Sequence, residues 1–379
     1  MDVMLYLRHF PAAGEPLVGG TAMAVAGLAR GLAESGARVT LLCEGEARSR
    51  TALAPGLEVE CFPRRGGARS FALGDALRSH VYERLRTRRG LCLLNGMFHP
   101  GVYALGAFLR RYGLPYVVAP HGSYEPAAFR RNAHLKWPYW YLFERSMLRG
   151  ARAVQVLDMR HARFLRRLGV GTRVIEAPNG VAPDAVPEEQ ALPPPAVVGP
   201  VRAVFLGRID AYTKGLDVLL DAVAQVAADD RIELTLQGPD QGDRSRLEGR
   251  ARALGIAGQV RFRAPEYRGS PVRLLAEHDL VCLPSRCEGF GLAALEAMIA
   301  GRVLLVSARA GIAPHVEASG AGVLVAPAPE DVARGLGELL RRRASWPDMG
   351  RQGRRYALAR LRWRDIAAAA LGSYAGLLD

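Results

Sequence analysis

Residues 203–217 read AVFLGRIDAYTKGLD, a stretch typical of the turn between a parallel β-strand and the helix that follows it. A short apolar run ends at Gly207, and a second glycine, Gly215, precedes an apolar helical pattern. Arg208 and Lys214 lie between the two glycines. Because the free amides and the dipole of a helix N-terminus both favour an anion, two cations beside one predict a phosphate-binding site.

Lysine is rare in this chain, which makes one of these two cations informative. Of 51 basic residues, only Lys136 and Lys214 are lysines. A lysine supplies a compact point charge and an arginine supplies a planar fork, so the pair can neutralise different oxygens of a pyrophosphate. The alternative, that both are ordinary solvated surface cations, stays open on sequence alone.

Working outward, short apolar runs alternate with helical patterns over the whole chain, which predicts parallel strands joined by helices. Met23 to Glu34 and Leu73 to Thr87 are the clearest predicted helices, and 346–378 is predicted to hold one or two more. The predicted strands are Val3 to Leu7, Arg38 to Cys43, Leu91 to Leu94, Tyr116 to Ala119, Ala153 to Val156, Ala203 to Leu206, Ile232 to Gln237, Val260 to Arg263, Leu280 to Leu283, Val303 to Ser307 and Gly322 to Val325.

A proline-rich segment, 183–200, interrupts the alternation and is interpreted as a linker. The fold class is therefore α/β, with two Rossmann-like doubly wound domains in series and a site expected between them. The predicted divisions are an N-terminal domain, 1–187, a C-terminal domain, 188–360, and a terminal helix, 361–379, that packs back on the N-terminal domain.

A second informative stretch, residues 283–298, reads LPSRCEGFGLAALEAM. Gly289 and Gly291 let a loop pass close to a ligand before a helix begins. Glu288 precedes that helix and Glu296 lies more than one turn inside it, so the two acids can accept hydrogen bonds from two separate sets of sugar hydroxyls. The alternative is a helix N-terminal acid and an exposed helix acid.

Composition limits the classes of protein that fit. The chain has 379 residues, 49% hydrophobic and 23% charged, which excludes a disordered or collagen-like chain. Five cysteines without a Cys-x-x-Cys pair suggest neither a disulfide framework nor a zinc ribbon. We see neither a signal peptide nor a run of about 18 to 20 apolar residues. A cytoplasmic protein is expected, and a peripheral place at the inner face of the membrane stays open.

The net charge of +14 is unevenly distributed. The first 187 residues hold 26 basic and 14 acidic residues, and the remainder holds 25 and 23. An excess of cations in one half is expected when that half meets a polyanion or an anionic membrane, although a general preference for arginine is the alternative.

Together the motifs resemble the GT-B-fold retaining glycosyltransferases of family 4. The resemblance rests on the two motif stretches and on three weaker features of the first half of the chain. The residues that carry it are Gly207-Arg208, Lys214-Gly215, Pro284-Ser285, Glu288-Gly289-Phe290-Gly291-Leu292, Glu296-Ala297-Met298, Gly301, Gly19-Gly20, Pro120-His121-Gly122 and Pro178-Asn179-Gly180-Val181.

The resemblance implies two domains facing across a cleft and transfer of a hexose from a nucleotide diphosphate sugar, which acts as co-substrate. Arg208 and Lys214 would hold the diphosphate, Glu288 the donor-sugar hydroxyls and Glu296 the ribose. His121 would approach the donor sugar from the other domain, or it is a neutral histidine that orders its own loop. The resemblance assigns further donor contacts to Gly19, Gly20, Gly207, Gly289, Phe290, Gly291 and Leu292.

No metal and no cofactor are expected, because the chain has neither an Asp-x-Asp motif nor a His-x-x-x-His cluster. Cations and helix ends would then neutralise the leaving diphosphate. The sequence offers no convincing carboxylate nucleophile for a reaction that retains the anomeric configuration. The family resemblance implies that the departing diphosphate deprotonates the acceptor.

Phe129 to Arg149 is the most distinctive segment on the acceptor side. Basic and aromatic residues together suit an interface with an anionic membrane, where a glycan or lipid-diphosphate-linked acceptor would lie. A helix with an aromatic core face and a solvated basic face, interrupted by Pro138, is the equal alternative. The basic residues of this segment are Arg130, Arg131, Lys136, Arg145 and Arg149, and its aromatic residues include Trp137, Tyr139, Trp140, Tyr141 and Phe143.

The leading prediction is a metal-independent glycosyltransferase of cell-envelope or exopolysaccharide biosynthesis. A GT-B-fold sugar-nucleotide epimerase or a phosphorylase is the alternative, although neither a catalytic acid pair nor a pyridoxal-phosphate lysine context is present. A basic nucleic-acid-binding protein is less favoured, because no recognition module is found. Nucleic acid is therefore not expected as a partner.

Overall fold

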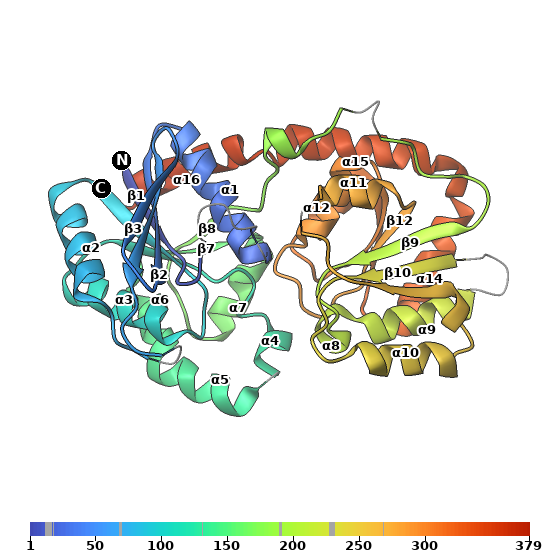
Figure 1. Ribbon diagram of the computed structural model, residues 1–379, viewed down its shortest axis with the longest axis horizontal. Helices are drawn as coiled ribbons and strands as arrows, with labels where there is room; N and C mark the ends of the chain where they lie inside the picture. The colour runs from blue at the N-terminus through green and yellow to red at the C-terminus, as the bar shows by residue number, and fades with distance from the viewer. Residues whose placement is uncertain are drawn as a thin grey trace. The chain divides into compact units, whose positions relative to one another are not determined.

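The computed structural model describes residues 1–11, 17, 19–67, 70–130, 132–188, 192–226, 232–267 and 269–379 (Figure 1). Contacts divide the chain into two compact units, Met1–Gly180 with Trp363–Asp379, and Val181–Arg362. Each unit holds one largely parallel sheet with helices on its faces. The predicted α/β class with two Rossmann-like folds is confirmed.

The sheet of the first unit has eight strands in the order β3-β4-β2-β1-β5-β6-β7-β8. All neighbours pair in parallel except β3 and β4, which form an antiparallel edge pair. The strands are β1 (Asp2–Tyr6), β2 (Arg38–Gly45), β3 (Ser49–Ala54), β4 (Leu57–Pro63), β5 (Gly90–Asn95), β6 (Tyr116–Ala119), β7 (Ala153–Val156) and β8 (Val174–Glu176).

Burial on both faces explains why the central strands read as continuous apolar runs. Every residue of β1 is buried, and β1 pairs with β2 on one side and β5 on the other. Met4 and Tyr6 join a core that includes residues of α2 (Asp75–Thr87), α3 (Pro100–Arg111) and α6 (Arg145–Gly150). Val3 and Leu5 alternate onto the opposite face.

Helix α1 (Gly20–Glu34) and the terminal helix α16 (Trp363–Ala375) pack together in the first unit, side by side in Figure 1. Two glycines make this contact close. A Cβ on Gly27 would lie 2.2 Å from Trp363 Nε1, and one on Gly31 would lie 2.7 Å from Trp363 O. The other helical segments of this unit are α4 (Pro126–Arg130), α5 (Ala133–Tyr139), the π-helical turn η1 (Trp140–Glu144), η2 (Met159–His161) and α7 (Ala162–Arg167).

The sheet of the second unit has six parallel strands in the order β11-β10-β9-β12-β13-β14. Strand order reverses between β9 and β12, so the carboxyl ends of these neighbours form a switch point, where ligands bind in open α/β sheets. The strands are β9 (Val201–Leu206), β10 (Ile232–Gln237), β11 (Val260–Arg263), β12 (Leu280–Leu283), β13 (Val303–Ser307) and β14 (Gly322–Val325).

Helices cover both faces of this second sheet. Figure 1 shows α9, α10 and α14 on one face and α11, α12 and α15 on the other. The helical segments are η3 (Pro183–Ala185), α8 (Ala211–Lys214), α9 (Leu216–Val226), α10 (Arg244–Ala253), η5 (Ala257–Gln259), α11 (Pro271–Ala276), α12 (Leu292–Ile299), α13 (Ala313–Ser319), α14 (Pro329–Arg341), η6 (Arg343–Ser345) and α15 (Trp346–Arg360).

The sequence prediction missed three strands of the first sheet, the edge strands β3 and β8 and the strand β4 that pairs with β3. β3 is exposed or partly buried throughout, β4 mixes buried residues with partly buried ones and includes two glutamates, and β8 has only three residues, so none presents a continuous buried apolar run. Both early helices also begin elsewhere than predicted, α1 at Gly20 and α2 at Asp75. No helix in the described part of the chain is long and apolar enough to cross a membrane.

Candidate functional site

The turn after β9 is shaped by a close approach of two backbones. Gly207 N donates a hydrogen bond of 2.9 Å to Gln237 O, and a Cβ on Gly238 would lie 1.9 Å from Gly207 O. The next side chain, Arg208, is exposed, and no hydrogen bond or ion pair joins its guanidinium to another described residue. Arg208 is therefore available to an anion at the carboxyl end of β9.

The short helix α8 carries Lys214 toward β12. Asp210 caps this helix, its Oδ1 accepting from Thr213 N at 2.8 Å. Gly215 ends the helix with a φ of 67°, and a Cβ there would lie 2.3 Å from Pro284 O. Only glycine fits such a place, because the left-handed backbone and the close carbonyl both exclude a side chain.

Backbone hydrogen bonds hold the loop after β12 against α8. Thr213 O accepts from Arg286 N at 3.0 Å and from Cys287 N at 3.2 Å. The guanidinium of Arg286 makes a two-point contact with Asp217, at 2.7 and 2.9 Å. The two stretches that the sequence singled out, 203–217 and 283–298, are thus one assembled structure.

The centre of this structure is an ion pair between Lys214 and Glu288. Lys214 Nζ lies 2.6 Å from Glu288 Oε2, and each side chain is 14% exposed. Ser285, which is fully buried, donates its hydroxyl to the same oxygen at 3.2 Å. Because both contacts fall on Oε2, Oε1 of Glu288 remains able to accept from a ligand hydroxyl.

The glycine-rich loop leads directly into α12. Gly291 precedes this helix with a φ of 104°, and Phe290 is buried with its carbonyl accepting from Ile312 N at 2.9 Å. A Cβ on Gly311 would lie 2.4 Å from Gly289 O, so this loop too is fixed by a close backbone contact. The backbone amides of the first turn, from Leu292 on, have no carbonyl partner within the helix. Together with the helix dipole they favour a negative charge beside the glycine-rich loop.

Glu296 lies inside α12 and is partly buried. Burial raises the pKa of its carboxyl to about 8, and no described residue forms a hydrogen bond or ion pair with it. A carboxyl group without a partner in an apolar setting can accept two hydroxyls of one ligand. Glu288 lies in the loop before α12 and Glu296 lies within that helix, so the two acids occupy separate positions.

His121 belongs to the first unit, in the turn after β6. Its backbone has a φ of 48°, and Gly122 follows with 81°. The ring Nε2 lies 2.8 Å from Asn95 Oδ1, at the end of β5. Burial lowers the pKa of His121 to about 4, so the ring is neutral at pH 7.

Gly19 and Gly20 mark the start of α1 in the same unit. Gly19 has a φ of 95°, and a Cβ there would meet nothing within 4 Å. Both residues are exposed. The space and backbone freedom at this N-terminus would allow a ligand to approach closely.

The described residues contain no group of three His, Cys, Asp or Glu that could hold a metal ion. Within the second unit the fold brings together Lys214, Glu288 and the glycine-rich loop. Arg208 follows β9, the neighbour of β12, and Glu296 lies one helix turn beyond the loop.

Phe129 to Arg149 is partly core and partly surface, and Arg131 lies outside the described residues. Trp140 and Phe129 are buried, which accounts for the aromatic core face. Leu135, Tyr141 and Leu142 are 62 to 67% exposed. Two of the basic residues are bonded to the backbone: Lys136 Nζ donates to Ala128 O at 2.5 Å, and the Arg149 guanidinium donates to Gly169 O at 2.9 and 3.1 Å.

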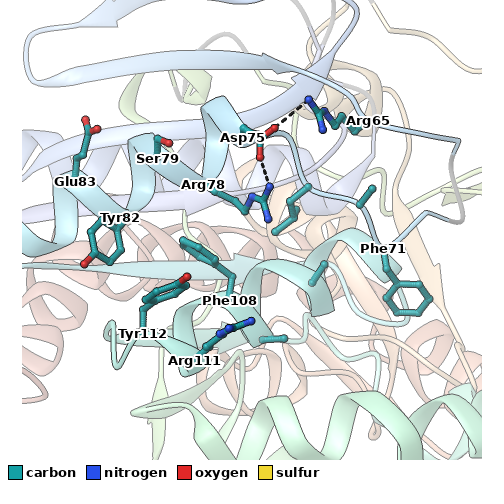
Figure 2. A pocket seen from close by; sticks show the side chains of 14 residues that line it. Arg65, Phe71, Asp75, Arg78, Ser79, Tyr82, Glu83, Phe108, Arg111 and Tyr112 are labelled. Carbon is teal, nitrogen blue, oxygen red and sulfur yellow. Dashed lines mark hydrogen bonds and ion pairs between the residues drawn. The ribbon is translucent and has the colours of Figure 1, made fainter.

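A separate open groove of about 680 Å³ lies between α2 and α3 of the first unit (Figure 2). Figure 2 shows Tyr82 from α2 facing Phe108 and Tyr112 from the α3 side. At the other end Asp75 pairs with both Arg65 and Arg78. None of the predicted site residues lines this groove.

Two family models match the chain in the order of its two units. Residues 19–180 match the model described as a glycosyl transferase 4-like domain, and residues 193–356 match the model described as glycosyl transferases group 1. The chain belongs to the group 1 glycosyltransferases, family 4. The family resemblance inferred from the motifs is confirmed.

Relatives of known name match only in part. The D-inositol 3-phosphate glycosyltransferase of Geodermatophilus obscurus is 37% identical over 154 residues, which cover 37% of this chain and 33% of that protein. Among the most similar relatives, the matches span 31 to 47% of the relative's own length.

Solved structures match over nearly the whole glycosyltransferase. Sucrose-phosphate synthase from Thermosynechococcus elongatus has a TM-score of 0.77 at 21% identity, covering 99% of this chain and 98% of that one. HepE from Anabaena, solved with UDP and glucose, has a TM-score of 0.71 at 17% identity, covering 99% and 100%. These likenesses confirm the GT-B fold.

Two residues of this glycosyltransferase that contact predicted site residues were not singled out from the sequence. Asn95 ends an apolar strand, and a polar residue at such a carboxyl end is a recognisable signal. Ser285 was part of the quoted motif without a role of its own. Its hydrogen bond to Glu288 depends on how the loop folds, which the sequence pattern does not reveal.

Proposed function

We propose that this protein is a retaining hexosyltransferase that moves a sugar from a nucleotide diphosphate sugar to a glycan or lipid-diphosphate-linked acceptor. The observation that carries the proposal is the Lys214–Glu288 pair of 2.6 Å, set between two helix N-termini. A cation for the diphosphate and a carboxylate for the sugar hydroxyls are adjacent, as a donor whose sugar is bonded to its phosphate requires.

The diphosphate gains negative charge as it leaves, and this charge must be neutralised in the transition state. In the proposed site Lys214 and Arg208 share this task, with the amides that open α12, and no metal ion is needed. Lys214 keeps its contact with Glu288 Oε2 while the diphosphate approaches its remaining protons, because an ammonium group has three donors. Glu288 Oε1 then accepts from the donor sugar, and Glu296 accepts from the ribose.

The acceptor is proposed to be presented at a membrane surface, in cell-envelope or exopolysaccharide synthesis, by a cytoplasmic protein held at the inner face. Support comes from Leu135, Trp137, Tyr141 and Leu142, which expose 39 to 67% of their surface over one short segment. Exposed apolar residues with neighbouring cations suit an interface with anionic lipid.

The test is thermal-shift binding with UDP, GDP, ADP and dTDP and their common sugar nucleotides. Binding to the native state stabilises a protein in proportion to the logarithm of ligand concentration over the dissociation constant, so a micromolar ligand gives a readable shift. One nucleotide should stand out, and Arg208→Ala should abolish its shift. Absence of any response in a folded sample would refute the donor site. Turnover of a sugar nucleotide with phosphate alone or without an acceptor would instead indicate a phosphorylase or an epimerase.

A further inference from the structure

The groove between α2 and α3 lies wholly within the first unit, apart from the residues of the proposed donor site (Figure 2). Its volume of about 680 Å³ falls in the range of about 300 to 1,000 Å³ that is usual for small-molecule sites. Asp75 and Glu83 line its two ends and are separated by about 12 Å along α2. The groove is therefore long enough for more than one sugar ring.

Aromatic rings line both ends of the groove. At one end the ring of Tyr112 lies 5.4 Å from that of Tyr82 and 4.9 Å from that of Phe108. At the other end the ring of Phe71 lies 4.9 Å from that of Phe143. Tyr112 is 46% exposed and Phe71 is 42% exposed. Each therefore presents ring surface to a ligand while its neighbours hold it in place, which lowers the entropy lost on binding.

The charged groups of the groove are nearly balanced. Asp75 pairs with Arg65 at 3.0 Å and also with Arg78. Arg111 and Glu83 line the groove as well, and no ion pair joins either of them to another residue in the described part of the chain. The groove thus offers both hydrogen-bond donors and acceptors, without a large excess of one charge.

A neutral sugar chain matches this combination of groups. The C–H groups on one face of a sugar ring stack against the electron-rich face of an aromatic ring, and the sugar hydroxyls both donate and accept hydrogen bonds. An anionic lipid or a polyphosphate requires an excess of unpaired cations, which the carboxylates of Asp75 and Glu83 oppose. An amphipathic helix requires a continuous apolar surface, which the charged residues interrupt.

The direction of the groove links it to the ligand-binding edge of the first sheet. Helices α2 and α3 follow β4 and β5, and a Cβ on Gly74, just before α2, would lie 3.1 Å from the carbonyl of Pro63, the last residue of β4. The Asp75 end of the groove is therefore close to the carboxyl ends of the strands, where ligands bind in open α/β sheets. Tyr112, which follows α3, marks the opposite end. The groove leads away from the edge at which an acceptor is expected.

We propose that this groove binds a neutral glycan, and that it holds the sugars of the acceptor that lie beyond the one being extended. The role of the glycan as acceptor rests on the proposed function, whereas glycan binding by the groove does not. Phe71 and Tyr112 stack against sugar rings, and Arg111 and Glu83 bond to sugar hydroxyls. Longer glycans bind more tightly than short ones, because only they reach both ends of the groove.

The test is a titration of the whole chain, without nucleotide, followed by ligand-observed nuclear magnetic resonance. The probes are maltohexaose, laminarihexaose and mannohexaose, each compared with the disaccharide of the same linkage. We expect at least one hexasaccharide to bind about tenfold or more tightly than its disaccharide. Equal affinities of hexasaccharide and disaccharide would overturn the extended groove.

Two matched variants locate the binding. Tyr112→Ser should weaken hexasaccharide binding about tenfold, because it removes an exposed ring from one end of the groove. The control Tyr267→Ser removes a tyrosine of the second unit that is also 46% exposed, and it should leave binding unchanged. Circular dichroism checks the fold of both variants. If Tyr112→Ser does not fold, Arg111→Ala takes its place, since the Arg111 side chain is exposed and should also weaken binding severalfold.

Binding of none of the three hexasaccharides, or equal losses in Tyr112→Ser and Tyr267→Ser, would overturn the proposal. Binding to phosphatidylglycerol vesicles that Tyr112→Ser abolishes, without hexasaccharide binding, would assign the groove to lipid instead. Hexasaccharide binding in a protein that binds no nucleotide would refute the proposed function and leave the glycan groove standing. Nucleotide binding without hexasaccharide binding would have the opposite meaning.

Discussion

Glu296 predicts a pH dependence of donor binding that can be worked out from its environment. Burial raises the pKa of its carboxyl to about 8 in the ligand-free protein, with no partner among the described residues to lower it. Ribose hydroxyls that donate to this group require the ionised carboxylate, so binding lowers its pKa and releases a proton. Affinity should therefore increase as pH rises toward 8.

The size of the effect follows from the fraction of Glu296 that is ionised before binding. With a pKa of about 8, that fraction is about 1% at pH 6, about 9% at pH 7 and about half at pH 8. Donor affinity should thus be about 100-fold below its limit at pH 6, about tenfold below at pH 7 and about twofold below at pH 8. The 100-fold difference between the affinity at pH 6 and its limit corresponds to about 2.7 kcal/mol of binding free energy.

The assay is isothermal calorimetry with a sugar nucleotide between pH 6 and pH 9. A sugar nucleotide is preferred to the free diphosphate, whose terminal phosphate titrates near pH 6 and would mask the effect. Repeating the titration in buffers of different ionisation enthalpy counts the released proton. Glu296→Gln should bind weakly and without this pH dependence. Affinity that is flat from pH 6 to pH 9 in the wild type would refute the reasoning.

The same raised pKa gives the sign of a stability effect. A carboxyl whose folded pKa lies above its unfolded value favours the folded state while it is neutral, and that contribution is lost as pH rises through about 8. Without ligand, Glu296→Gln should therefore have a higher melting temperature than the wild type at pH 9 and a smaller advantage at pH 6.

Three further predictions concern the donor site. Lys214→Ala should lower turnover at least about 100-fold while circular dichroism stays unchanged, because it removes the cation next to Glu288, and near-normal rates would exclude the diphosphate role. Gly215→Ala should lower the free energy of unfolding in urea by about 2 to 4 kcal/mol, because its Cβ would lie 2.3 Å from Pro284 O. The control Gly113→Ala has a similar φ of 64° but open space around its Cβ, so it should lower that free energy by only about 1 kcal/mol. Equal losses would contradict the steric argument. EDTA should leave activity intact, and restoration of a lost activity by magnesium or manganese would contradict a metal-independent reaction.

The sequence predicted the class of the fold because buried parallel strands are legible as short apolar runs. All eleven predicted strands are present, including β9 and β12, which precede the loops of the proposed donor site. The missed strands β3 and β8 lie at edges, where one side meets water and the apolar pattern disappears. β4 is paired on both sides, but its apolar residues alternate with Glu58 and Glu60, so it shows no continuous apolar run. The π-helical turn after Pro138 was likewise not visible, since proline indicates a disruption and not its form.

The residues of the proposed donor site were chosen from the sequence, because glycines, a rare lysine and two spaced acids are informative in themselves. Only the tertiary structure decided which atoms meet: that Lys214 and Ser285 share one oxygen of Glu288, and that Asn95 meets His121. Hydrogen bonds between residues 26 to 74 positions apart depend on strand order and loop geometry, which no local pattern encodes. The raised pKa of Glu296 has the same origin, because burial is a property of the assembled fold.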